Sequence, residues 1–187
     1  MSIQYSKVRI AGHPVHPMLI AFPVAFYTAT FLGFAAFAAT TDLFWWRLGL
    51  WSNAAGVITA LIAAIPGFID WAAGIPKGHP AKATGRTHMI LNLVALALFT
   101  INLIVQTDKW VDLARTAMAT GDIVTPNPTA ALVLSLLGVA FTIAAGFFGW
   151  KMVQTHHVGV ELSDEQRRLE PTAFEQASRA RHGGTLA

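Results

Sequence analysis

Four apolar blocks separated by short polar segments dominate the chain. They cover residues 18–39, 49–69, 88–106 and 130–153, and each is close to the ~20 residues that a helix needs to cross the hydrocarbon core of a bilayer. Apolar residues surround each predicted helix instead of forming one stripe, which favours burial in lipid. The sequence therefore predicts an all-α polytopic membrane protein, an antiparallel bundle of four transmembrane helices.

The segments outside these blocks have distinct characters. Residues 1–17 form a short polar arm. Residues 108–120 have an amphipathic pattern followed by Gly121, which predicts a short interfacial helix on the membrane surface. Residues 155–187 form a polar tail, in which Ser163 and Gln166 resemble a capping box and predict some helix.

An even number of spans places both ends of the chain on one side of the membrane. The positive-inside rule then decides which side. Six basic residues flank the spans on the side of the termini, namely Lys7, Arg9, Lys77, Lys82, Arg86 and Lys151. The other side has Arg47, Lys109 and Arg115. We therefore expect cytoplasmic N- and C-termini.

Composition excludes several classes of protein and of cofactor site. The chain is 54% hydrophobic and 12% charged, whereas a soluble domain is about 25% charged. It has no cysteine, which excludes disulfides, cysteine-ligated iron–sulfur clusters and c-type haem attachment. The net charge of +3 is modest, and the bases flank the spans, so no nucleic-acid partner is predicted.

Histidines gather at the predicted cytoplasmic face. The motif Gly12-His13-Pro14-Val15-His16-Pro17 precedes the first span, and six of the seven histidines fall on that face: His13, His16, His79, His88, His156 and His157. Asp70 ends the second span at the same level, where a carboxylate is disfavoured by the helix dipole and by nearby lipid. It needs a cation, which Arg86, a protonated histidine or a metal ion could supply.

This cluster predicts a haem or metal site. The candidate ligands are His13, His16, His88 and Asp70, with Arg86 and Asn92 beside them. His79, His156 and His157 are weaker candidates. Two histidines on different segments suit haem b, and His88 can pair with His13 or with His16. Three histidines plus Asp70 would instead suit non-haem iron or zinc.

A polar seam runs along the third span, where His88, Asn92, Asn102 and Gln106 share one helical face. The second span carries a matching face from Asn53 to Asp70. We expect Asn53, Asn102 and Gln106 to join these antiparallel spans by hydrogen bonds, and this pair to form the tightest contact in the bundle.

The motifs also resemble a known family. Gly-His-Pro-x-His-Pro, Phe22-Pro23, Gly67-x-x-Asp70-Trp71 and Arg86-x-His88-x-x-x-Asn92 resemble the bacterial four-span membrane family called domain of unknown function 2231, over roughly residues 10–155. The resemblance implies the bacterial inner membrane and carries over His13, His16, Asp70, Arg86, His88 and Asn92. Some members look like fusions to Rieske-type domains, which implies a redox setting with a separate Rieske or cytochrome partner here.

Three functions follow from these features. The first is a membrane electron-transfer protein with haem b or a transition metal. The second is an accessory or assembly subunit of a membrane complex, homo- or hetero-oligomeric, with no cofactor of its own. The third is a small transporter that uses the polar seam. We predict a redox or accessory subunit more than a stand-alone enzyme, and no catalytic residue is assigned.

Overall fold

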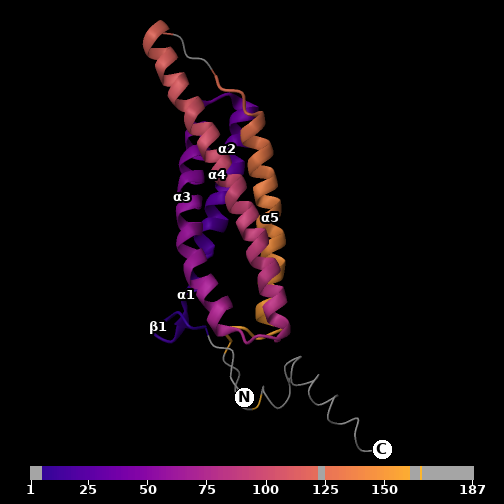
Figure 1. Cartoon of the computed structure of the whole chain (residues 1–187). Helices are drawn as coiled ribbons and strands as arrows, with labels where there is room; N and C mark the ends of the chain where they lie inside the picture. Colours follow the sequence, from indigo (N-terminus) through magenta and orange to yellow (C-terminus); the bar gives the residue numbers. More distant parts are fainter. Residues whose placement is uncertain (1–5, 122–124, 161–164, 166–187) are drawn as a thin grey trace, which may run out of the picture.

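The computed structural model describes residues 6–121, 125–160 and 165, and these form a bundle of long helices (Figure 1). Helix α1 (Val15–Leu19) leads almost directly into α2 (Ala21–Thr40), and α3 (Leu43–Ile69) runs on into a π-helical turn, η1 (Asp70–Gly74). Helices α4 (Pro80–Thr120) and α5 (Thr129–Gln154) follow. The predicted all-α four-span bundle is confirmed.

The arm folds into a very small hairpin before the first span. Strand β1 (Arg9–Ile10) pairs antiparallel with β2 (His13–Pro14). The two connecting residues, Ala11 and Gly12, both have positive φ, at 49° and 83°, as a two-residue type I′ hairpin turn requires. The hairpin places His13 outside the bundle and delivers His16 into α1.

The third span is much longer than its apolar block. The sequence predicted a separate surface helix over 108–120, but this prediction is wrong because α4 continues through it to Thr120. No proline or glycine interrupts residues 87–120, and Gly121, with φ of 74°, ends the helix. At 1.5 Å per residue, α4 is about 60 Å long, about twice the hydrocarbon thickness. In Figure 1 its end rises beyond the other helices.

The helices pack as two antiparallel hairpins, α2 with α3 and α4 with α5, and contacts between α3 and α4 are far fewer. The expectation that the second and third spans form the tightest pair is therefore wrong. Close approach of glycines explains the observed pairing. A Cβ on Gly33 of α2 would lie 2.8 Å from the backbone nitrogen of Gly49 on α3, and one on Gly138 of α5 would lie 2.5 Å from the Phe99 ring of α4.

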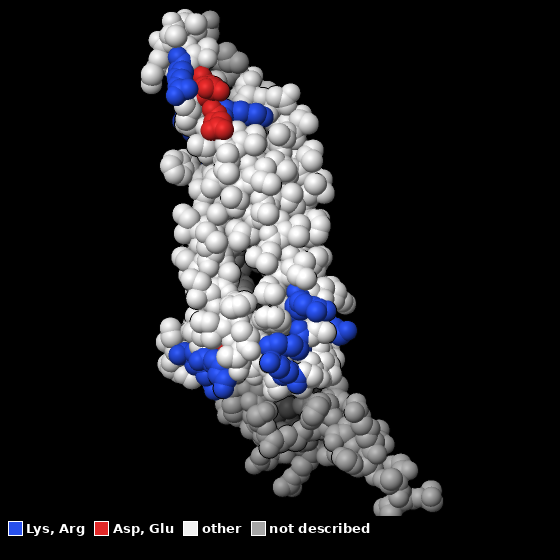
Figure 2. Space-filling model, in the orientation of Figure 1, with Lys and Arg blue, Asp and Glu red and all other residues white. Residues whose placement is uncertain are grey.

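The outer surface is apolar around the middle of the bundle. Large apolar side chains such as Ile65, Ile143 and Phe147 are more than half exposed, which suits contact with lipid. Figure 2 shows that Lys, Arg, Asp and Glu lie at the two ends and leave a band without charge between them. Together with four helices long and apolar enough to span a bilayer, this surface shows a multi-pass membrane protein.

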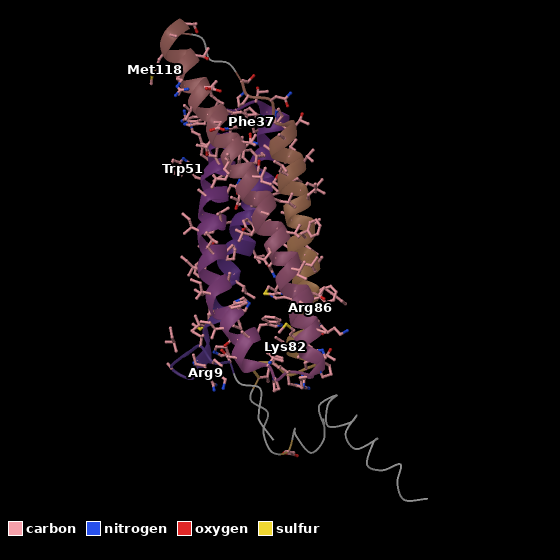
Figure 3. The ribbon with its side chains drawn as sticks, in the orientation of Figure 1. Arg9, Phe37, Trp51, Lys82, Arg86 and Met118 are labelled. Atoms are coloured by element: carbon pink, nitrogen blue, oxygen red, sulfur yellow. The ribbon has the colours of Figure 1, made fainter. Side chains whose placement is uncertain are left out.

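The two ends differ in charge. Arg9, Lys82 and Arg86 lie at the end that carries the hairpin, which we call the arm end, whereas Met118 lies at the opposite, far end (Figure 3). Basic side chains dominate the arm end, and acidic and basic side chains mix at the far end (Figure 2). The predicted tail helix near 164–181 lies outside the described residues, apart from Glu165.

Candidate functional site

Two histidines from different helices face each other inside the arm end. His16 comes from α1 and His88 from the third turn of the long helix α4. Their rings are 6.3 Å apart between centres and nearly perpendicular, at 85°. Of the two histidines that the sequence offered, His16 and not His13 lies next to His88.

Each ring is fixed through its Nδ1 atom. His16 Nδ1 lies 2.9 Å from the carbonyl oxygen of Ala63, and His88 Nδ1 lies 2.8 Å from that of Ala145. A carbonyl oxygen only accepts, so each Nδ1 carries the proton and donates it. The lone pair of each neutral ring is therefore on Nε2, the arrangement that second-shell carbonyls impose on metal-binding histidines.

Glycines make room for both rings. A Cβ on Gly67 of α3 would lie 2.7 Å from His16 Nδ1, and one on Gly149 of α5 would lie 3.1 Å from His88 Cε1. The rings thus lie directly against the backbones of neighbouring helices. Sequence analysis did not assign these glycines to the site, although Gly67 lies one turn before Asp70 and Gly149 lies near the end of the fourth span.

Asn92 lies one turn after His88 on α4. Its Nδ2 donates to the carbonyl oxygen of His88 at 2.9 Å and lies 3.2 Å from His88 Nε2. Asn92 thus reaches the ring nitrogen that keeps its lone pair. A metal bound at that nitrogen would replace this amide contact, which makes Asn92 a neighbour of the site and not a ligand.

Asp70 holds the arm. Its Oδ1 accepts from the backbone nitrogens of Lys7, at 2.6 Å, and Val8, at 3.1 Å, and its Oδ2 accepts from Ser6 Oγ at 2.6 Å. The expected ion pair with Arg86 is absent between these two described residues, and the Arg86 side chain is exposed. The carboxylate is satisfied by N–H and O–H donors, so the cation that the sequence seemed to require is not needed.

The helix end beside Asp70 has a cationic cap that sequence analysis missed. Lys82 Nζ donates to the carbonyl oxygens of Trp71, Ala72 and Ile75, and it lies 4.4 Å from the centre of the Trp71 ring. The Trp71 indole donates in return to the Lys82 carbonyl oxygen at 3.1 Å. A lysine here offsets the negative end of the α3–η1 dipole and locks the loop that leads to α4.

A second pair of histidines lies outside the spans. His79 and His156 are both buried, with ring centres 6.1 Å apart. The His79 Nδ1 caps α4 by accepting from the Ala81 nitrogen, and His156 Nε2 lies 3.2 Å from Thr84 Oγ1. Burial lowers the pKa of both imidazoles, and their mutual repulsion lowers that of His79 further. Lys151 and His157 add to the lowering of the His156 pKa.

The remaining candidates stay apart from the central pair. The exposed His13 turns back to its own hairpin, with Nδ1 2.9 Å from the Ala11 carbonyl oxygen. His157 has φ of 52° in the turn that follows α5. Among the described residues, no group of three or more His, Asp or Glu side chains is close enough to hold one metal ion. The site is therefore a pair of imidazoles and not a multi-ligand cluster.

Comparison with known proteins identifies the family. The family model described as "Predicted membrane protein (DUF2231)" matches residues 12–162, which is most of the chain. The chain belongs to this family. No curated protein and no solved structure matches it. The region shared with DUF2231 contains both histidine pairs, their glycine neighbours and Asp70, whereas Ser6, Lys7 and Val8, which contact Asp70, precede it.

Proposed function

We propose that this DUF2231 protein binds one redox cofactor, a b-type haem or a transition-metal ion, through Nε2 of His16 and His88, and that it transfers electrons at the cytoplasmic face of a bacterial inner membrane. The observation that carries the proposal is the pair itself. Two imidazoles on different helices are 6.3 Å apart, and each is held by a carbonyl oxygen in the tautomer that a metal needs.

His16 and His88 would hold the cofactor through two imidazole nitrogens. A pair without a third protein ligand suits a group that brings its own donors, as haem does with its pyrrole nitrogens. Such a haem would supply one-electron chemistry at its iron. A bare iron or zinc ion would have to complete its coordination with water.

The distribution of basic residues supports an orientation in which the arm end faces the cytoplasm. The arm end carries Arg9, Lys82 and Arg86 (Figure 3), with Lys7 against Asp70 and Lys151 in the last turn of α5. Excess Lys and Arg favours the cytoplasmic side. The histidine pair then lies near the cytoplasmic surface. Because the far end has no histidine among its described residues, electrons would leave on the side where they enter, through a separate Rieske-type or cytochrome partner.

A second function, as an accessory subunit, is favoured by the far end of α4. The last turns of α4 rise beyond the other helices (Figure 1), with Met118 88% exposed. An exposed extension of this kind offers a surface to a larger complex. In that case the histidine pair would only join α1 to α4.

Purification of the whole chain in mild detergent separates these functions. Haem predicts a Soret band, a bare metal predicts colourless or weakly coloured protein with stoichiometric iron or zinc, and the accessory function predicts neither, with redox subunits that co-purify. Protein that lacks haem and metal after expression with added haem precursor and metal salts would contradict the redox proposal.

A further inference from the structure

A layer of polar side chains crosses the bundle nearer its far end than its arm end, and every long helix contributes to it. The layer comprises five fully buried residues, each with 0% exposure: Thr30, Asn53, Asn102, Gln106 and Ser135. Val57 of α3 and Phe99 of α4 belong to one packed cluster. Asn53 and Asn102 each lie about one turn beyond this cluster towards the far end, so they lie at a similar depth. Asn102 Nδ2 also donates to Ala131 of α5, one turn from Ser135, at 3.5 Å.

Aromatic side chains close the layer on both sides. Towards the far end, the Trp46 ring packs edge to face on Phe34 and Phe37, with centres 5.2 and 5.0 Å apart. Towards the arm end, Tyr27 stacks on Phe99 with centres 3.7 Å apart and planes at 3°. The layer therefore lies between two aromatic clusters, in which Trp46 Nε1 and Tyr27 Oη are also buried without a partner among the described residues.

The hydrogen-bonding capacity of this layer exceeds what the described residues use. Both side-chain atoms of Asn53, Oδ1 and Nδ2, are buried without a partner, and so is Gln106 Oε1. Gln106 Nε2 donates to Asn102 Oδ1 at 2.9 Å, whereas the hydroxyls of Thr30 and Ser135 donate to carbonyls of their own helices. Lipid cannot satisfy such groups, and buried polar atoms are rarely left unpaired.

We propose that this layer is an enclosed binding site for water. Water can donate to Asn53 Oδ1 and to Gln106 Oε1 and can accept from Asn53 Nδ2, and about three hydrogen bonds are typical of buried water. None of the five side chains is charged, so the site suits an uncharged ligand that is both donor and acceptor. This layer is then hydrated, independently of any cofactor at the histidines.

A cysteine at position 135 tests the proposal, because the chain has no cysteine of its own and Ser135 lies in the layer without supplying any of the three proposed hydrogen bonds to water. The full-length variant Ser135→Cys is treated with methylmercury, which also reaches the interior through lipid. The reaction rate then reports whether the thiol can ionise. The control is Ala95→Cys, which is buried at an apolar position on α4. We expect Ser135→Cys to react at least about ten times faster, since the thiolate is the reactive form. Equal rates would overturn the proposal.

The unmodified protein provides a second measurement, which does not depend on how the variants fold. Water-edited solid-state NMR in bilayers detects magnetisation that passes from water to nearby groups. We expect rapid transfer to the side-chain amides of Asn53 and Gln106, and slow transfer to the backbone amide of Ala95. Equally slow transfer at all three would show a dry layer and refute the water site.

Discussion

The imidazoles of His16 and His88 meet edge to face, 6.3 Å apart between ring centres, although one comes from the short first helix and the other from α4. The His16 ring lies against Gly67 of α3 and the His88 ring against Gly149 of α5. Each ring donates from Nδ1 to a backbone carbonyl of the same helix as that glycine. Four helices thus fix the two rings, and a fixed ligand pair is what tight binding of a metal requires.

A methyl group at Gly67 should displace His16. The Cβ of Gly67→Ala would lie 2.7 Å from His16 Nδ1, so the ring must move and lose its bond to Ala63. We expect a loss of about 1–3 kcal/mol in stability and at least about tenfold weaker binding of the cofactor, measured by thermal unfolding and by titration in detergent.

Gly146→Ala is the matched control, because nothing lies within 4 Å of a Cβ at that position. It should leave the binding unchanged and stabilise α5 slightly, as alanine favours helix. The account of the glycines would be wrong if both alanine variants bound the cofactor as the wild type does.

Removal of the Asp70 carboxylate should release the arm. Asp70→Ala leaves the backbone nitrogens of Lys7 and Val8 without their acceptor, and the Ser6 hydroxyl keeps only the Val8 carbonyl oxygen. We expect a loss of about 1–3 kcal/mol and faster trypsin cleavage after Lys7 and Arg9, followed by mass spectrometry. Asp112→Ala, at the exposed far end, should not change the cleavage rate, and an unchanged rate in Asp70→Ala would contradict this role.

Stability should fall when the pH drops through about 6.5. Burial lowers the pKa of His79 and of His156 below the ordinary value of 6.5, so the unfolded chain binds more protons than the folded one in this range. Their contribution is fully present above pH 6.5 and is lost as the pH falls towards the lowered pKa values. Thermal unfolding between pH 5 and 8 should show this slope, and His156→Gln should reduce it. Identical slopes would contradict the assignment.

Sequence alone predicted the spans and the end at which the histidines gather, because continuous apolar blocks and basic flanks are local signals. It also predicted that Asn53, Asn102 and Gln106 face inward, and they are fully buried. The hydrogen bonds expected to join the second and third spans through them are absent among the described residues, because Gln106 bonds Asn102 on its own helix and the Asn53 side chain has no partner. It could not predict the partner of Asp70. The backbone nitrogens of the arm leave no side-chain signature, so Arg86 seemed the natural counterion.

The sequence could not show which of His13 and His16 lies beside His88, because the hairpin decides it. Both histidines precede a proline in the same motif, and only the turn at Ala11-Gly12 separates an exposed His13 from the half-buried His16. The tightest helix pairs were also missed, because glycine contacts such as Gly33 against Gly49 depend on which faces meet. Apolar blocks that are hydrophobic all round do not reveal this.

Cofactor content of three histidine variants tests the central claim most directly. His16→Ala, His88→Ala and His13→Ala are expressed alongside the wild type with haem precursor and metal salts, purified in mild detergent, and assayed for haem and metal per chain. The account predicts that His13→Ala retains the wild-type content and that the other two each lose it by at least about tenfold. Retention in His16→Ala and His88→Ala, or an equal loss in His13→Ala, would contradict the account.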